Sequence, residues 1–202
     1  MTDISNNLTK NETGYELGGE MYLFHQTPTL LGKDLMQFVP LVAGDTCYEP
    51  FAGEGAFYNA FPSFVSSEWC EITQGKDYKD YKGSYDWVIT NPPFRMPNEK
   101  GVLKNAIYPL LLEFAKTAKK GIAFLVSDYG FNSLTPVRIA KMRSLGFYLH
   151  SLTTCAVKEW RGRYYFLVWT KIPSSFLTCL TTTYSNKSNK SIGQSPTFGK
   201  AE

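Results

Sequence analysis

Asn91-Pro92-Pro93-Phe94 is the stretch of this chain whose residue types could do chemistry most directly. It follows the apolar run Trp87-Val88-Ile89-Thr90, which predicts a short buried strand, so it lies where the chain turns over the edge of a sheet. Two successive prolines remove two backbone N–H donors, and the first holds Asn91 extended. What remains is a set of carbonyl acceptors beside the flat face of Phe94. Such an array suits a planar group with an NH2, whose hydrogens meet acceptors while its ring stacks.

A glycine-containing loop lies upstream. Asp45-Thr46-Cys47-Tyr48-Glu49-Pro50 predicts a short strand, and Phe51-Ala52-Gly53-Glu54-Gly55-Ala56-Phe57 predicts a loop that opens a helix. Glycines let the backbone approach a ligand closely, and a helix N-terminus offers N–H groups. One Gly-x-Gly without a third glycine is not the dinucleotide-binding pattern. The loop is a candidate for wrapping a small ligand, and a plain packing turn is the alternative.

Two acidic residues lie between these stretches. Residues 64–71 predict the next strand, and Glu71 falls near its carboxyl end. A carboxylate there can accept hydrogen bonds from both hydroxyls of a ribose. Glu68 competes with Glu71 for this role, and either acid could instead be a solvated loop residue.

The segment Gln26-Thr27-Pro28 precedes all of these. It leads into apolar residues with the spacing of an amphipathic helix, for which Thr27 or Thr29 is the expected N-cap. The N-terminus of such a helix can hold an anion. Because Thr-Pro opens helices in many proteins, only the position of this segment along the chain indicates a binding role.

Along the chain the motifs run from the Thr-Pro segment through the glycine-containing loop and the acids to Asn-Pro-Pro-Phe. In that order they resemble the S-adenosylmethionine-dependent N6-adenine DNA methyltransferases that carry an Asp/Asn-Pro-Pro-Tyr/Phe motif. The resemblance covers about residues 24–171. It implies an α/β fold of the class I methyltransferase (Rossmann-like) type: a doubly wound, mostly parallel seven-stranded sheet with an antiparallel terminal hairpin. It also implies S-adenosylmethionine as cofactor. We therefore expect an enzyme that methylates the N6 amine of adenine in DNA.

The resemblance also implies roles for individual residues. The catalytic residues would be Asn91, Pro92, Pro93 and Phe94, with the Asn91 oxygen and the Pro92 carbonyl accepting the two hydrogens of the amine. The Thr-Pro segment would hold the carboxylate of the cofactor, and the loop its methionine part. Asp77 would accept from the cofactor's adenine amine, Tyr78 would cover that ring, and Glu49 would face the ammonium side. The implied cofactor-binding residues are Gln26, Thr27, Pro28, Glu49, Pro50, Phe51, Ala52, Gly53, Gly55, Glu71, Asp77, Tyr78 and Asn91.

A basic, aromatic segment follows a predicted helix over 134–146. Residues 158–171 predict a turn centred on Arg161-Gly162 and then an aromatic strand. The family closes its sheet with such a hairpin, whose turn lies beside the target base. Basic residues among aromatic ones suit phosphates and bases. The candidate nucleic-acid-binding residues are Lys158, Trp160, Arg161 and Arg163, whereas 165–168 are expected to be ordinary strand residues.

Several alternatives stay open. The substrate could be structured RNA, or the chain could be a catalytically silent nucleic-acid-binding subunit of a methyltransferase pair. Protein glutamine methylation normally shows Tyr in place of Phe94, and cytosine-N4 methylation Ser in place of Asn91. Cytosine-C5 chemistry uses a Pro-Cys dipeptide, which is absent from the sequence. DNA-specific members usually carry a target-recognition domain after the hairpin, and only a polar tail follows here. We therefore expect a short recognition site, a homodimer or a recognition subunit.

The composition is compatible with a nucleic-acid-binding enzyme but would not by itself indicate one. A chain of 202 residues with 43% hydrophobic residues can bury one sizeable core, and its net charge is +3. The four cysteines are scattered, and with only two histidines they give no zinc spacing, so no metal is expected. This cysteine usage indicates reduced cytosol, and no signal peptide or membrane span is apparent, so we expect a cytoplasmic protein.

The expected organisation is a catalytic domain between two polar segments. Residues 1–20 are predicted to be a flexible N-terminal segment, 21–173 the methyltransferase domain, and 174–202 a disordered polar tail. Within the domain we expect a helix over 101–118 and a buried strand over 121–126. The loops 95–100 and 128–136 leave strands at the ligand edge, where long loops are often functional.

Overall fold

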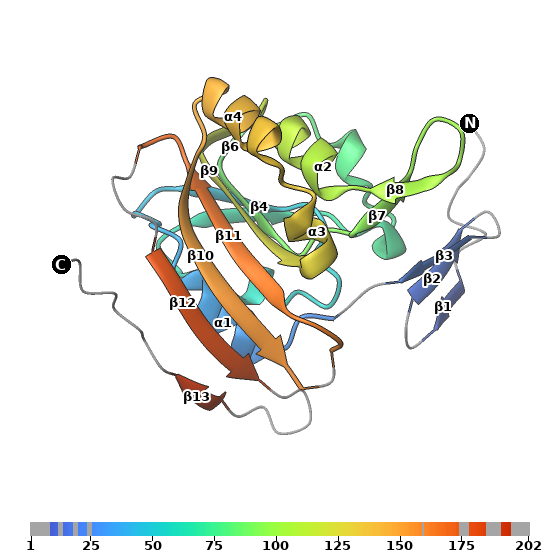
Figure 1. The fold of residues 1–202 in the computed structure, drawn as a ribbon, viewed down its shortest axis with the longest axis horizontal. Coiled ribbons are helices and arrows are strands. Elements are labelled where there is room, and N and C mark those ends of the chain that lie inside the picture. The colour runs from blue at the N-terminus through green and yellow to red at the C-terminus, as the bar shows by residue number, and fades with distance from the viewer. Residues whose placement is uncertain are drawn as a thin grey trace.

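The computed structural model describes residues 26–158 and 160–173 with their side chains, and the backbone of strands at 9–11, 14–17, 20–23, 178–184 and 191–194. At its centre is a sheet of eight strands in the order β13-β12-β10-β11-β9-β6-β4-β5 (Figure 1).

One half of this sheet is parallel. It contains β5 (Ser66–Trp69), β4 (Thr46–Glu49), β6 (Tyr85–Thr90) and β9 (Ala118–Ser127). Next to it, β11 (Tyr164–Thr170) runs antiparallel to both β9 and β10 (Tyr148–Val157). The predicted doubly wound sheet with an antiparallel terminal hairpin is confirmed. The parallel strands β4, β6 and β9 all end at one edge of the sheet, called here the carboxyl edge.

The predicted number of seven strands is wrong. Six strands of the central sheet lie within residues 46–170, and β12 (Thr178–Tyr184) and β13 (Ser191–Gln194) add two more to it. β12 pairs in parallel with β10, and β13 pairs with β12. The threonines and tyrosine of β12 favour a strand, and β10 would otherwise present an unpaired edge. Both strands lie within 174–202, the segment that was expected to be a disordered polar tail.

The described part of the N-terminal segment also forms strands. β1 (Thr9–Asn11), β2 (Gly14–Leu17) and β3 (Glu20–Leu23) make a three-stranded antiparallel sheet. Hairpin pairing at short range explains why a polar segment expected to be flexible adopts strands here.

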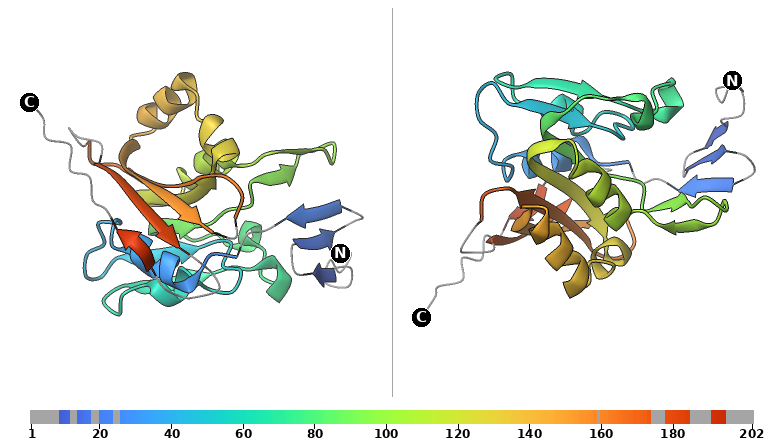
Figure 2. Two further views of the ribbon diagram at one scale, coloured as in Figure 1. Left: turned by 60° about the horizontal axis from the view of Figure 1, so that its bottom comes forward. Right: turned by 90° about the horizontal axis from the view of Figure 1, so that it is seen from above.

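Helices cover both faces of the central sheet (Figure 2). α2 (Ile107–Phe114) and α4 (Pro136–Ser144) pack on one face, and α1 (Thr29–Met36) packs on the other. β9 shows why two layers are needed: Ile122, Phe124 and Val126 join the α2 side, while Ala123 and Leu125 join the α1 side. A central strand that is buried on both faces reads as a continuous apolar run, which is how the strand over 121–126 could be predicted.

The helix predicted over 101–118 is shorter than expected. The structure instead forms a hairpin from β7 (Arg95–Pro97) and β8 (Leu103–Asn105), and α2 begins only at Ile107. Gly101 adopts φ +75 in the turn, and the Asn105 side chain accepts a hydrogen bond from the Ile107 N–H at 3.0 Å. A glycine turn followed by an asparagine that caps the chain therefore overrides the helical pattern.

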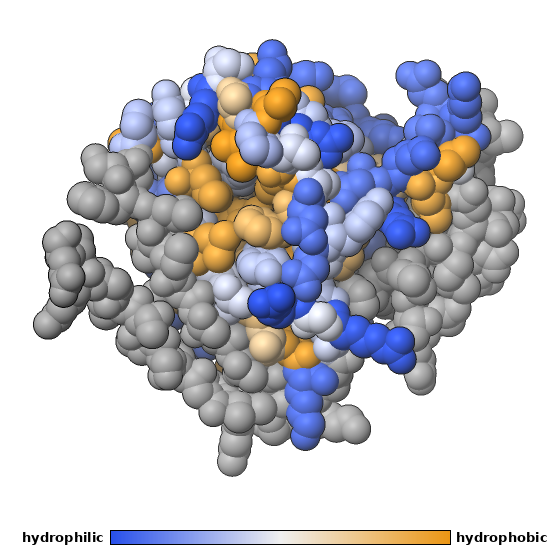
Figure 3. All heavy atoms as spheres, viewed as in Figure 1, coloured by the Kyte–Doolittle hydropathy of each residue, from blue (hydrophilic) through white to orange (hydrophobic). Residues whose placement is uncertain are grey.

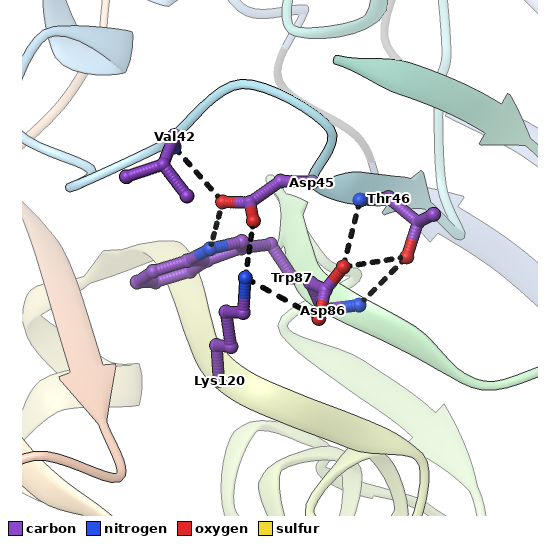
Figure 4. Close-up of polar contacts among 6 residues, drawn as sticks. All are labelled: Val42, Asp45, Thr46, Asp86, Trp87 and Lys120. Carbon is purple, nitrogen blue, oxygen red and sulfur yellow. Dashed lines mark hydrogen bonds and ion pairs between the residues drawn. The ribbon is translucent and has the colours of Figure 1, made fainter.

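The opposite edge of the sheet is held by a polar cluster (Figure 4). The Asp45 carboxylate accepts hydrogen bonds from the Val42 N–H and the Trp87 indole, each at 3.0 Å, and it pairs with Lys120. Burial alone would raise the pKa of Asp45, but the hydrogen bonds from Lys120, Val42 and Trp87 outweigh it and lower that pKa. Beside it, Asp86 accepts hydrogen bonds from the N–H and hydroxyl of Thr46. The cluster ties together the beginnings of β4, β6 and β9.

Candidate functional site

Asn91 joins two distant parts of the chain at the carboxyl edge. Its side-chain Nδ2 donates to the Thr27 hydroxyl at 3.2 Å, across 64 residues of sequence. The preceding residue, Thr90, donates its hydroxyl to the Phe51 carbonyl at 3.5 Å. The corner after β6 thus touches both the segment before α1 and the loop after β4. Because the amide nitrogen faces Thr27, the side-chain oxygen of Asn91 faces away from it.

The glycine-containing loop depends on its glycines. Gly53 and Gly55 adopt φ +54 and +82, a region that favours glycine. A Cβ on Gly53 would lie 3.0 Å from the Gln26 side-chain oxygen, which also accepts from the Glu54 N–H at 3.3 Å. The Gln26-Thr27-Pro28 segment therefore contacts this loop as well as Asn91. The predicted helix after the loop is wrong, since only the short 3₁₀ helix η2 (Tyr58–Ala60) follows.

Two expectations for the segment before α1 also change. The N-cap of α1 is Pro28 and makes no side-chain cap hydrogen bond, so neither Thr27 nor Thr29 is the cap. Thr27 instead bonds Asn91, because its hydroxyl lies toward the corner after β6. Sequence reasoning also missed Gly32, where a Cβ would lie 2.6 Å from the Ala56 carbonyl oxygen. Gly32 lets α1 pack directly on the loop.

Two buried carboxylates anchor the loop. Glu71 accepts from the Gly53 N–H at 2.7 Å and from the N–H and hydroxyl of Thr73 at 3.0 and 2.8 Å. Glu49 accepts from the Tyr58 N–H at 2.6 Å. Burial raises the pKa of Glu49 well above its usual range; the Tyr58 hydrogen bond opposes this, and the charge of Glu71 adds to it. Glu68 is exposed on β5, so Glu71 is the acid that the fold brings to the loop.

An aromatic cluster lies beside these acids. The Phe51 and Tyr78 rings are 4.8 Å apart between centroids, and both contact Phe114 of α2. Asp77 caps the short helix η4 (Tyr78–Asp80) by accepting from the Lys79 N–H at 3.0 Å. The Asp-Tyr pair is thereby placed next to Phe51 of the loop.

Phe94 contacts the terminal hairpin. Its ring lies 6.1 Å from that of Tyr164, which lies 4.5 Å from that of Trp160, measured between centroids. The turn between β10 and β11 therefore lies next to the corner after β6. Lys158, Arg161 and Arg163 are exposed on this turn. Tyr164, like Phe114, was not singled out by the sequence, because a buried aromatic residue in a strand usually only fills the core.

Asp128 begins the segment 128–136, which was expected to be a functional loop, but its individual contacts were not predicted. It follows β9 directly and begins α3 (Asp128–Asn132). Its carboxylate accepts from the Arg163 N–H at 3.2 Å and from the Tyr165 hydroxyl at 2.9 Å. The signal available was its position immediately after the buried strand, where polar residues often belong to a site.

The edge offers acceptors and aromatic faces, and two of the buried cysteines of the domain are poor nucleophiles. Burial raises the pKa of Cys47 and Cys155 to about 12, and the charges of Asp45 and Asp86 add to this for Cys47, so neither thiol ionises readily. No three His, Cys, Asp or Glu residues within the described part of the chain are arranged to hold a metal ion. None of the helices in the described ranges has the length and apolar character needed to cross a membrane.

The fold is that of the class I S-adenosylmethionine-dependent methyltransferases. A protein from Listeria monocytogenes assigned to that class superposes with a TM-score of 0.58 at 13% identity, covering 77% of this chain and 65% of its own. The type I restriction-modification methyltransferase subunit from Streptococcus thermophilus gives 0.54 at 14%, covering 90% and 51%. A protein from Vibrio vulnificus assigned as a type I modification subunit gives 0.54 at 13%, covering 79% and 47%.

The chain therefore spans about half to two thirds of the length of these structural neighbours. No protein-family model and no curated protein matches the sequence. At identities this low, the similarity defines the fold, and the chemistry has to be argued from the site itself.

Proposed function

We propose that this protein transfers a methyl group from S-adenosylmethionine to the N6 amine of adenine in DNA. One observation carries the proposal: Asn91, at the start of Asn-Pro-Pro-Phe, is hydrogen-bonded to Thr27 at 3.2 Å, in the segment that also contacts the glycine-containing loop through Gln26. The segment proposed for the cofactor and the corner proposed for the target base thus share one hydrogen-bonded contact.

The residues at the carboxyl edge fit the cofactor. Glu71 accepts three hydrogen bonds, and a carboxylate has about four acceptor sites, so it retains capacity for a ribose hydroxyl. Gln26-Thr27-Pro28 would receive the carboxylate, with the loop from Glu49 to Gly55 around the methionine part. Rings that flank a third ring must be about 7 Å apart, so the 4.8 Å contact leaves no room for adenine between Phe51 and Tyr78. The adenine would therefore stack on one of them, beside Asp77, or Tyr78 would move.

The chemistry required of the protein is mainly positioning. S-adenosylmethionine supplies a methyl carbon on a sulfonium. The Asn91 oxygen and the Pro92 carbonyl would accept the two N6 hydrogens, which orients the nitrogen lone pair and opposes its delocalisation into the ring. Phe94, which touches Tyr164, would stack on the base. Transfer would leave the cofactor as a neutral thioether, and the N6 proton held by the Asn91 oxygen or the Pro92 carbonyl would pass to solvent.

The structural neighbours support a nucleic-acid substrate, since two of the three belong to restriction-modification systems. DNA in duplex form would have to present its adenine by flipping, at a cost of a few kcal/mol. Because those neighbours are subunits, we also propose that a second subunit, of this chain or of another, contributes to target recognition.

The test is transfer of tritiated methyl groups to duplex DNA, single-stranded DNA and structured RNA in parallel, followed by identification of the modified nucleoside. The proposal expects N6-methyladenine in DNA. Label entering only RNA would overturn the choice of substrate, and label entering only protein would overturn the class of reaction. Failure of the protein to bind S-adenosylmethionine in calorimetry would overturn the enzyme assignment.

A further inference from the structure

Two basic hairpins lie next to Phe94. The first, β7–β8, follows Phe94 directly and carries the exposed residues Arg95, Lys100 and Lys104 against one acid, Glu99. The second is the turn between β10 and β11, already described. In Figure 3 hydrophilic side chains project at the places that both segments have in Figure 1, beside a hydrophobic patch on the β7–β8 hairpin.

The short helix α3 contacts both hairpins through adjacent residues. On one side, the Arg95 guanidinium lies 5.1 Å from the Tyr129 ring centroid, and the Asn105 side chain donates to the Tyr129 carbonyl at 3.2 Å. On the other side, the Asp128 N–H donates to the Arg163 carbonyl at 3.0 Å, and the Arg163 N–H returns a hydrogen bond to the Asp128 carboxylate. α3 therefore acts as a bracket between two segments far apart in sequence.

Both hairpins are also fixed relative to Phe94. The Phe94 carbonyl accepts from the Ala106 N–H at 3.0 Å, immediately after β8, and the Phe94 ring contacts Tyr164 at the start of β11. The Tyr165 hydroxyl donates to Asp128 at 2.9 Å, and the Phe131 ring stacks on Tyr165 with 4.4 Å between centroids. Phe94 thus lies at the junction of the two hairpins and the bracket.

We propose that α3 holds the β7–β8 hairpin and the β10–β11 turn as the two arms of a clamp for a DNA strand. Cations of both arms contact the phosphates on either side of a base that reaches Phe94. Phosphate contacts set the register of a strand, while the base pocket reads the target. Asp128 and Tyr129 are positioning residues of this clamp. The clamp rests on the proposed function and adds the β7–β8 arm, part of which the sequence indicated only as a loop at the ligand edge.

The salt dependence of DNA binding tests the arm. Each phosphate contact contributes about 0.7 to the slope of log K against log salt for single strands. For a fluorescein-labelled single-stranded oligonucleotide measured by anisotropy, Lys100→Ala/Lys104→Ala should reduce this slope by about 1 to 1.5. The matched control is Lys116→Ala/Lys119→Ala, two exposed lysines outside the clamp, one just before β9 and one at its beginning, which should leave the slope unchanged. Equal slopes for both double variants would overturn the clamp.

The bracket is tested by steady-state kinetics. Tyr129→Ala should raise KM for DNA several-fold while KM for the cofactor stays constant, whereas Tyr129→Phe, which keeps the ring under Arg95, should restore KM. Similar KM values for DNA in all three proteins would overturn the bracket. If the wild-type protein transfers no methyl group but the slopes change as expected, the proposed function is wrong and the clamp is retained. If the protein methylates DNA but the Lys100→Ala/Lys104→Ala variant keeps the wild-type slope, the clamp is wrong and the proposed function is retained.

Discussion

The Glu71 carboxylate accepts a hydrogen bond from the Gly53 N–H at 2.7 Å, across 18 residues of sequence. This bond joins the chain after β5 to the loop after β4, so the acid proposed for the ribose and the loop proposed for the methionine part form one unit. Disturbing either residue is therefore expected to affect the whole cofactor side of the site, while the opposite edge of the sheet stays intact.

A pair of isosteric variants can show whether Glu71 or Glu68 binds the ribose of the cofactor. Glu71→Gln should weaken S-adenosylmethionine binding about tenfold or more, because hydrogen bonds to a charged group contribute about 1.5–3 kcal/mol. Glu68→Gln, at an exposed position of β5, should change the affinity less than about twofold. Isothermal titration calorimetry gives both values. A larger loss in Glu68→Gln than in Glu71→Gln would reverse the assignment.

Gly32 should be sensitive to a single methyl group. Gly32→Ala places a Cβ 2.6 Å from the Ala56 carbonyl oxygen, a backbone atom that cannot move without shifting the loop. We expect a loss of about 1–3 kcal/mol in the free energy of unfolding, although alanine is the better helix former. Lys33→Ala, the exposed neighbour in α1, should stay within about 0.5 kcal/mol. Urea denaturation measures both, and equal stabilities would contradict the close packing.

Asp45 should make part of the stability depend on acid pH. Its pKa is lowered in the folded state, so its contribution is present above the ordinary value of 3.8 and is lost as the pH falls through the lowered value. Asp45→Asn cannot accept all of these hydrogen bonds and should cost about 1–3 kcal/mol at pH 7. The difference between wild type and variant should shrink towards pH 3. A pH-independent difference in chemical denaturation would contradict the lowered pKa.

Glu49 should act in the opposite sense. Its pKa is raised above the ordinary value of 4.5, so its contribution to stability is complete below that value and is lost as the pH rises through the folded-state pKa. Glu49→Gln keeps an acceptor for the Tyr58 N–H without a charge. The variant should gain stability relative to wild type as the pH rises from 5 to 9, and the exposed control Glu99→Gln should not. If the stability of Glu49→Gln and that of wild type change with pH in parallel, the pKa of Glu49 is not raised in the folded state.

The fold could be predicted where local pattern and topology agree. The apolar run over 121–126 and the aromatic segment after Arg161-Gly162 both form the strands expected of them. The predicted helix over 101–118 began too early, because β8 pairs with β7 and the Asn105 side chain caps the chain before α2. Seven strands were expected from the resemblance to the methyltransferase family. The addition of β12 was not predicted, because it depends on the open edge of β10, which no local pattern encodes.

The candidate site could be predicted as a set of motifs but not as a set of contacts. Parallel strands bring their carboxyl ends together, so Asn91 and the loop at Gly53 were expected near one another. The contacts of Gly32 with Ala56 and of Asp128 with Arg163 depend on how separate elements pack, and neither residue belongs to a recognisable motif. Such residues become visible only in three dimensions.

The rate of methyl transfer by Asn91 variants tests the central claim most directly. With Asn91→Ala the rate on adenine-containing DNA should fall about 100-fold or more, the usual effect of removing a preorganised polar contact to a reacting group, while cofactor affinity falls far less. Asn91→Asp should retain part of the rate, because its carboxylate still accepts from the amine. An Asn91→Ala variant that methylates DNA at the wild-type rate would contradict the account.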